Sequence, residues 1–363
     1  MAVTRVPLRN FVKEYSVRNK NNEEIPVYSV TNSQGFCTEY FGKEVASQDK
    51  TTYKIVPKGY FAYNPSRINV GSVDWQRTEE RVIVSPLYNV FSVTDEIDRQ
   101  YLYYFLKSNI GRQMIKAKAS GSVRDNLKLE MLKEMTIPDI SVTQQSFEAS
   151  VLDRLQLLIQ LRQKELQQLD ELIKARFVEM FGHPDKNEKG WKMNTFGDIC
   201  TVRQGLQIPI SKRLSEYEEG CYEYITVQYL HGGKAREYIK NPKDTVICNK
   251  DDILMTRTGN TGMVITDVDG VFHNNFFLID FDRNKYNKDF LVQYLNLDMI
   301  QADIIRRAGT STIPDLNHGE FYKIHIFEPP MSLQIEFNAI VKRIDKSKVL
   351  GRALDFKPTY GYI

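Results

Sequence analysis

The interval from Asp139 to Phe181 contains neither glycine nor proline, and this feature most restricts what the chain can fold into. Pro138 precedes the interval, and Gly182 and Pro184 follow it, which is the usual punctuation of a helix. We therefore predict one continuous helix over residues 141–182. Its length is roughly 63 Å at ~1.5 Å per residue.

Apolar residues recur inside this interval at alternating spacings of three and four, with interruptions at Arg162 and Arg176. Such a heptad pattern is typical of a helix that packs along another helix. The helix is too long, and its apolar stripe too narrow, for a core helix. We predict that its seam meets a second helix through Leu152, Leu155, Ile159, Leu166, Leu169 and Ile173.

The sequences on both sides of the helix have short runs of Tyr, Val, Ile, Thr and Phe between polar turn residues, which predicts short strands. Several segments recur in the second half. Tyr101-Leu102 matches Phe290-Leu291 at an offset of 189, and VPKGYFAYN matches CNKDDILMT at 192. We also match Phe11 with Ser16-Val17-Arg18 to Phe196 with Thr201-Val202-Arg203, at 185. A period this long predicts two related domains.

We therefore predict an α+β chain in which each of two β-rich domains is followed by a helix. The second helix is the shorter one and carries Ile340 and Ile344 on its apolar face. The predicted segments are residues 1–140, 141–182, 183–330, 331–351 and an atypical tail, 352–363.

Composition excludes several classes of protein. The chain has 363 residues, 42% of them hydrophobic, and a formal net charge of only +3, so any nucleic-acid binding must come from local patches. No segment has the length and apolarity of a membrane span or of a secretory signal, and the four cysteines form no metal-binding pattern. We expect a cytoplasmic protein with free thiols, no metal site and no membrane partner.

Motifs that carry catalysis are not found. The five histidines are scattered, and no nucleophile elbow or phosphate loop occurs. Asn64-Pro65-Ser66-Arg67 lacks the second proline and the aromatic residue of an amino-methyltransferase motif, so we interpret it as non-catalytic. We predict that the chain is not an enzyme and holds no cofactor.

Polar loops with basic residues stand at equivalent places in the two halves. Asn, Arg, Ser and Thr are the side chains that read base edges or hold phosphates, and loop N–H groups also suit phosphate oxygens. Solvated turns are the alternative for any one loop, but recurrence in both halves favours contact with double-stranded DNA. The candidate DNA-binding residues are Asn64, Ser66, Arg67, Asn69, Ser120, Ser122, Arg124, Arg203, Arg257, Thr258, Asn260, Thr261, Thr310, Ser311 and Thr312.

The order of these elements resembles the specificity subunit of type I restriction–modification enzymes. The segment from Trp191 to Cys200 is similar to the opening of a target recognition domain, and Lys250–Arg257 with Gly259 and Gly262 is similar to its strand and loop. Lys58–Asn64 resembles another version of that element. The run Phe177–Gly182, which closes the central helix, also fits, and the resemblance covers about residues 1–350.

The resemblance implies two target recognition domains held apart by two helices that pack as an antiparallel coiled coil. It implies that the chain reads a bipartite DNA target and docks two modification (methyltransferase) subunits and restriction/translocase subunits. S-adenosylmethionine, ATP and Mg²⁺ are then expected on those partner subunits only.

Two alternatives stay open. The short second helix is also compatible with a degenerate scaffold or inhibitor that binds the partner subunits without reading DNA. A stand-alone enzyme acting on nucleic acid is the third hypothesis, and it predicts methyl transfer or cleavage by the purified chain alone.

Overall fold

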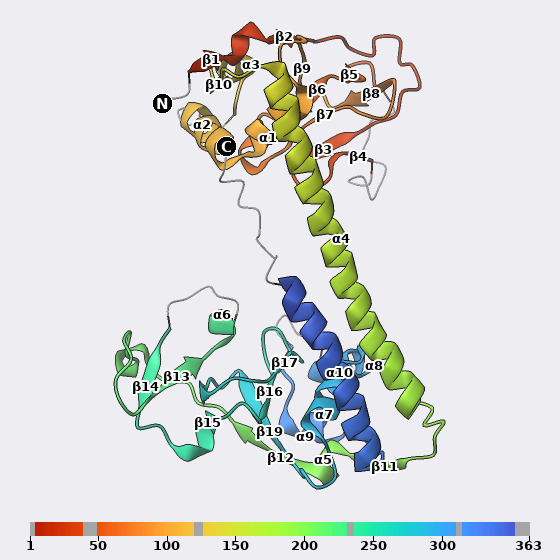
Figure 1. Ribbon diagram of the computed structural model, residues 1–363, viewed down its shortest axis with the longest axis vertical. Helices are drawn as coiled ribbons and strands as arrows, with labels where there is room; N and C mark the ends of the chain where they lie inside the picture. Colours follow the sequence, from red (N-terminus) through yellow and green to blue (C-terminus); the bar gives the residue numbers. More distant parts are fainter. Residues whose placement is uncertain (1–3, 39–48, 120–125, 231–235, 310–313, 353–363) are drawn as a thin grey trace. The chain divides into compact units, whose positions relative to one another are not determined.

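The structure is a computed structural model that describes residues 4–38, 49–119, 126–230, 236–309 and 314–352. The chain divides into two compact units, and the division falls between Arg162 and Gln163 inside the long helix α4 (Val142–Phe181). Figure 1 shows α4 as one uninterrupted helix. Ser141 Oγ accepts the Gln144 N–H at its start (3.2 Å), and Gly182 follows its end with φ +82°, a value that favours glycine.

Unit 1 is built around a four-stranded antiparallel sheet in the order β2-β9-β6-β7, with helices packed against it. Its elements are β1 (Arg5–Pro7), η1 (Leu8–Asn10), β2 (Val12–Glu14), β3 (Ser29–Thr31), β4 (Gly35–Cys37), β5 (Lys54–Pro57), β6 (Phe61–Tyr63), η2 (Ile68–Val70), β7 (Val73–Trp75), β8 (Arg81–Val84), β9 (Asn89–Val93), α1 (Arg99–Lys107), α2 (Asn109–Ala119), α3 (Leu129–Lys133) and β10 (Thr136–Pro138). Three two-stranded sheets, β1-β10, β3-β4 and β5-β8, complete the unit.

Unit 2 has the same central arrangement, a four-stranded sheet in the order β12-β19-β16-β17. Its elements are β11 (Lys192–Thr195), α5 (Phe196–Ile199), β12 (Cys200–Gln204), η3 (Ile210–Lys212), β13 (Cys221–Ile225), α6 (Val227–Leu230), β14 (Tyr238–Lys240), η4 (Asp244–Val246), β15 (Ile247–Cys248), β16 (Ile253–Thr256), β17 (Val264–Ile265), β18 (Gly270–Phe272), β19 (Phe276–Phe281), α7 (Lys288–Leu295), α8 (Asp298–Ala308), α9 (His318–Tyr322), β20 (His325–Glu328) and α10 (Met331–Arg352). A second sheet, β14-β13-β18-β15, and the pair β11-β20 accompany it. The predicted α+β duplication is therefore confirmed.

The strand registers correct one part of the predicted alignment. The Leu8 N–H donates to Met135 O (2.8 Å), and the Phe196 N–H donates to Ile324 O (2.9 Å) in the corresponding place of unit 2. Leu8, and not Phe11, is thus the counterpart of Phe196, and the predicted match of Ser16-Val17-Arg18 to Thr201-Val202-Arg203 is wrong by three residues. A valine followed by an arginine was too weak a pattern to fix the register.

A buried glutamine joins each sheet domain to the helix that follows it. Gln145 Oε1 accepts the N–H of Asp98, the residue that caps α1 (2.9 Å), and Gln334 Oε1 accepts the N–H of Asn287, which caps α7 (2.8 Å). Both side chains also donate to the backbone: Gln145 to Ile140 O, and Gln334 to Lys285 O and Pro329 O. We call this arrangement the glutamine clamp.

Replacing Gln334 by leucine is expected to destabilise unit 2 by about 3 kcal/mol, because it leaves buried backbone groups without partners. Urea unfolding followed by hydrogen exchange of unit 2 amides measures the effect. Gln168→Leu, on an exposed position of α4, is the matched control and is expected to change stability by less than about 0.5 kcal/mol. Equal losses in the two variants would contradict the role of the clamp.

Within unit 2, the last part of α4 packs against α10. Ile173, Phe177 and Phe181 share one core with Phe337 and Ile344. The ring centroids of Phe177 and Phe337 are 5.5 Å apart, while Lys348 Nζ, near the other end of α10, lies 2.7 Å from Asp170 Oδ1. Moving forward along α10 thus means moving backward along α4, so these segments run antiparallel.

The residues of the predicted seam differ in how far they are buried and in which core they contact. Leu169 and Ile340 pack at the edge of the core of unit 2, Ile173 and Ile344 lie inside it, and Leu152 packs against the core of unit 1. Leu155 is 50% exposed, and Ile159 and Leu166 are half-buried, so their contact with a partner helix stays a prediction. The heptad pattern places Arg176 on the seam, but the buried residue near the end of α4 is Phe177. The positions of a strict heptad rotate by ~20° per heptad around a straight helix, so the buried face moves to the next residue.

Candidate nucleic-acid interface

In each unit, a polar loop follows one of the two inner strands of the four-stranded sheet. These strand-end loops are residues 64–72, after β6, and residues 257–263, after β16. The fully buried Leu127 donates its N–H to Pro65 O (3.0 Å), and the fully buried Leu316 donates to Arg257 O (2.8 Å). The same backbone bond therefore holds the loop in both units. In the sequence, the predicted contact residues 120–124 and 310–312 come shortly before Leu127 and Leu316.

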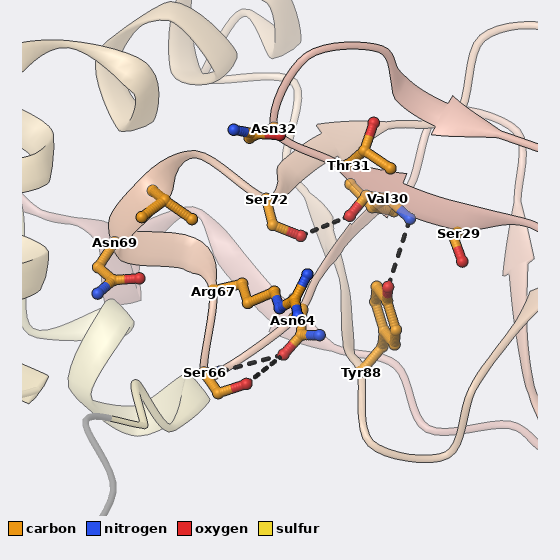
Figure 2. A pocket seen from close by; sticks show the side chains of 11 residues that line it. Ser29, Val30, Thr31, Asn32, Asn64, Ser66, Arg67, Asn69, Ser72 and Tyr88 are labelled. Atoms are coloured by element: carbon orange, nitrogen blue, oxygen red, sulfur yellow. Dashed lines mark hydrogen bonds between the residues drawn. The ribbon is translucent and has the colours of Figure 1, made fainter. Parts of the chain in front are cut away.

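The strand-end loop of unit 1 borders a cavity of about 580 Å³, shown in Figure 2. The structure brings four of the predicted DNA-binding residues together in its lining: Asn64, Ser66, Arg67 and Asn69. Ser66 and Arg67 are exposed, while Asn64 and Asn69 are half-buried. None of the eleven described residues that line the cavity is acidic. The described lining of the cavity therefore offers amide, hydroxyl and guanidinium groups without a competing carboxylate.

Hydrogen bonds inside this loop fix its shape before anything binds. Asn64 Oδ1 accepts both the N–H (3.1 Å) and the O–H (2.9 Å) of Ser66, which is the turn chemistry of asparagine. Ser72 donates its hydroxyl to Val30 O, which joins the loop to β3 (Figure 2). Gly71 closes η2 with φ +99°, a conformation that a side chain would strain.

Unit 2 builds its strand-end loop around an ion pair. Arg257 Nε and Nη2 donate to the two carboxylate oxygens of Asp315 at 2.9 and 2.7 Å, and Nη1 donates to Gln204 Oε1 at 3.0 Å. The hydrogen bond to Arg257 lowers the pKa of the Asp315 carboxyl. The guanidinium, predicted to contact DNA, thus holds three separate segments of the chain together.

The other predicted residues of this loop have different surroundings. Thr261 is buried, and its hydroxyl donates to Arg257 O (3.1 Å) and Pro314 O (2.8 Å). Thr258 is half-buried and pairs by a β-bridge with Asp315, whereas Asn260 is exposed. Asn260 is therefore the most accessible of the three.

Arg203 is directed away from this loop. Its Nη1 donates to Asp244 O (3.4 Å) and Thr245 O (3.3 Å) in η4, while the next residue, Gln204, contacts Arg257. Successive side chains of a strand point to opposite faces of the sheet. Arg203 and Gln204 therefore point to opposite sides of β12, and only Gln204 reaches the loop. The sequence interpretation missed Gln204 and Asp315, because nothing in their local sequence marks them.

Six predicted contact residues lie outside the described residues. They are Ser120, Ser122, Arg124, Thr310, Ser311 and Thr312. Their role in DNA contact stays a prediction.

The described parts of the chain contain no group of three or more His, Cys, Asp or Glu side chains arranged to hold a metal ion. The four cysteines are free, as predicted, and three of them are buried. Among the described helices, none combines the length and apolarity required to cross a membrane.

The chain belongs to the family of type I restriction modification DNA specificity domains, which it matches over residues 9–171 and 188–350. The two matched segments correspond to the two halves of the duplication.

The chain is also similar to specificity subunits of Methanocaldococcus jannaschii. It is 25% identical over 278 residues to the type I restriction enzyme MjaIX specificity subunit, covering 68% of this chain and 62% of that protein. It is 25% identical over 170 residues to the MjaVIII specificity subunit, covering 47% and 39%. The chain thus spans less than two thirds of the length of these relatives.

Two solved structures share the fold. The type I restriction–modification S subunit from M. genitalium gives a TM-score of 0.56 at 17% identity, covering 98% of this chain and 93% of that one. A chain from a study of complex assembly and conformational transition of the type I R-M system gives 0.54 at 15% identity, with the same coverage. At these identities the likeness establishes the fold alone.

Proposed function

We propose that this chain is the DNA-sequence specificity subunit of a type I restriction–modification enzyme and that each unit reads one half of a bipartite target. The observation that carries the proposal is the recurrence of the strand-end loop on the same sheet, held by the same backbone bond at Leu127 and Leu316. Both loops present amide, hydroxyl or guanidinium groups, which recognise base edges and phosphates. Family membership supports the same function.

In this function the candidate residues divide by their surroundings. Asn64, Ser66, Arg67 and Asn69 present polar groups in the cavity of unit 1, and Asn260 does so in unit 2. Arg257, Thr258 and Thr261 contribute chiefly by holding their loop in shape. A loop ordered before binding loses less conformational freedom when the DNA docks.

The helices α4 and α10 serve as the framework on which two modification (methyltransferase) subunits dock, with restriction/translocase subunits joining them. The partners supply S-adenosylmethionine, ATP and Mg²⁺, and this chain performs no catalysis itself. Its binding to DNA is expected to weaken as salt rises, because phosphate contacts release counterions.

The test is to map methylated adenines across the host genome with and without this gene. We expect one bipartite methylated motif to disappear when the gene is deleted and to return on complementation. Persistence of every methylated motif in the deletion strain would overturn the proposed function.

The difference in helix length favours a second candidate. Within the residues that the structure describes, α4 has 40 residues and α10 has 22, so the described parts of the two helices are unequal. A scaffold that binds the modification subunits without reading DNA would retain the fold and this inequality. Recovery of modification subunits by pull-down, from a strain that lacks any motif dependent on the gene, would favour it.

A further inference from the structure

A second cavity, of about 360 Å³, adjoins the strand-end loop of unit 1. Its lining consists of Asn69 from η2 and Asn109, Arg112, Gln113 and Lys116 from α2. The four residues of α2 stand at positions i, i+3, i+4 and i+7 and so share one face of the helix. Asn69 also lines the larger cavity, so the two cavities are neighbours.

This cavity is electropositive, and some of its polar groups have no partner. No acidic residue is among its described lining residues, which include the cations Arg112 and Lys116. Arg112 Nε and Asn69 Oδ1 are buried without a hydrogen-bond partner in the part of the chain that the structure describes. Rotation of the Asn69 amide would present N–H donors to the same space. A bound anion would satisfy these groups.

The surroundings of Arg112 add to the positive field. Its Nη2 lies against the backbone of Gly71, where a Cβ would come within 3.2 Å of it, so the guanidinium reaches the strand-end loop. Burial lowers the pKa of the Lys107 ammonium, the charge of Asp74 opposes that shift, and Arg112 and Arg77 lower it further. Among the described residues, Lys107, Arg112 and Arg77 therefore stand near one buried carboxylate, Asp74, which pairs with Arg77 at 2.7 Å.

The corresponding helix of unit 2, α8, has the same length but lacks this surface. Ile115 and Ile304 are fully buried at corresponding positions, which aligns the two helices. At the places of Arg112 and Lys116, α8 carries Gln301 and Ile305. Gln301 Nε2 donates to Gly262 O (2.9 Å), so it holds its own loop, and Ile305 is 46% exposed.

The cations of α8 are neutralised within unit 2. Arg306 pairs with Asp303, and Arg307 Nε donates to the same carboxylate at 2.7 Å. Asp298, the counterpart of Asn109, brings a negative charge and pairs with Lys174. The duplication therefore provides an internal comparison: the described residues of one copy line a basic cavity without a carboxylate, and the corresponding helix of the other copy carries paired cations.

We propose that Arg112, Lys116 and Asn69 bind one phosphodiester group of the DNA backbone beside the half-site read by unit 1, and that α8 makes no such contact. This inference rests on the proposed function, because it takes DNA as the ligand. A guanidinium and an ammonium on one helix face suit the charge and the several acceptors of a phosphate. Such a contact fixes the position of the duplex without reading its sequence.

The test is the salt dependence of DNA binding by the chain in complex with its modification subunits. The probe is a fluorescein-labelled duplex that carries the motif identified by methylation mapping. In the double variant Arg112→Gln/Lys116→Gln, we expect the slope of log affinity against log salt to become shallower by about 1, the value for one phosphate contact. The motif preference is expected to stay unchanged.

Lys118→Gln/Lys133→Gln is the charge-matched control, because these two lysines are paired with Glu134 and Glu130. The control is expected to keep the wild-type slope. An unchanged slope in the Arg112/Lys116 variant, or an equal loss in the control, would overturn the α2 site while leaving the proposed function intact. Absence of salt-dependent binding by the wild-type complex would instead overturn the proposed function.

A neutral methylphosphonate placed at successive linkages of the same duplex gives an independent readout. We expect one linkage, flanking the half-site of unit 1, at which the substitution weakens the wild-type complex but not the Arg112/Lys116 variant. Equal sensitivity of wild type and variant at every linkage would contradict the site.

Discussion

Replacing Phe177 by alanine is expected to destabilise unit 2 by about 3–5 kcal/mol, the range found for large aromatic residues removed from a core. The Phe177 side chain is fully buried. Its ring lies between 4.8 and 6.2 Å, centroid to centroid, from those of Phe181, Phe290, Tyr294, Phe327 and Phe337. These rings come from α4, α7, β20 and α10, so the substitution leaves a cavity where four elements meet.

Chemical denaturation measures the loss of unfolding free energy, and hydrogen exchange of the amides of each unit shows which unit loses it. The amides of α7 are expected to lose protection, while those of α1 in unit 1 keep theirs. Leu172→Ala, also in α4 but 45% exposed, is the control and is expected to change stability by less than about 1 kcal/mol. Comparable losses in the two variants would show that the aromatic cluster does not anchor the end of α4.

Replacing Arg257 by alanine is expected to weaken binding of the motif by about ten- to one-hundredfold. The variant loses the charge-assisted bonds to Asp315 and the bond to Gln204, and bonds to charged groups contribute about 1.5–3 kcal/mol each. The loop of unit 2 then loses its shape, whereas assembly with the modification subunits is expected to persist. Competition binding and co-purification provide the two measurements, and unchanged motif affinity would contradict a role for this loop.

Asp315→Asn separates the shape of the loop from its charge. The amide keeps the volume of the carboxylate but leaves the Arg257 charge uncompensated, so we expect steeper salt dependence together with weaker motif preference. The folded state lowers the pKa of Asp315, so the stability from this pair is present above the pKa of the unfolded chain and is lost as pH falls through the lowered value. The pair is therefore expected to be intact at neutral pH.

The sequence predicted those features that depend on local chemistry. Glycine and proline at the ends of one interval predicted the long helix, because proline cannot continue a helix and glycine readily adopts the left-handed conformation that closes one. The recurrence of aromatic and aliphatic positions predicted the duplication, and the identical strand orders of the two sheets confirm it. The shift of the buried position from Arg176 to Phe177 could not be predicted from an ideal heptad, because the drift accumulates along a straight helix.

The candidate site could not be predicted in the same way, because its contacts join residues that are far apart in the sequence. Arg257 and Asp315 are 58 positions apart, and no local pattern identifies the carboxylate that holds the guanidinium. The choice between Arg203 and Gln204 depended on which face of β12 meets the loop, and this is determined by pairing with β19. The cavity beside α2 requires η2 to pack on that helix, so Asn69 and Arg112 meet only in the folded unit.

The glutamine clamp also bears on how such a chain can change in evolution. Each clamp is closed within its own unit: Gln145 with Asp98 on one side of the division in α4, and Gln334 with Asn287 on the other. A recombination event between genes, with its crossover in the part of α4 near Arg162, would transfer a sheet domain together with the glutamine that bonds to its capping residue. The incoming segment would bring the buried hydrogen bonds of its own glutamine clamp. New target specificity could therefore be acquired without compensating substitutions in the core of the recipient.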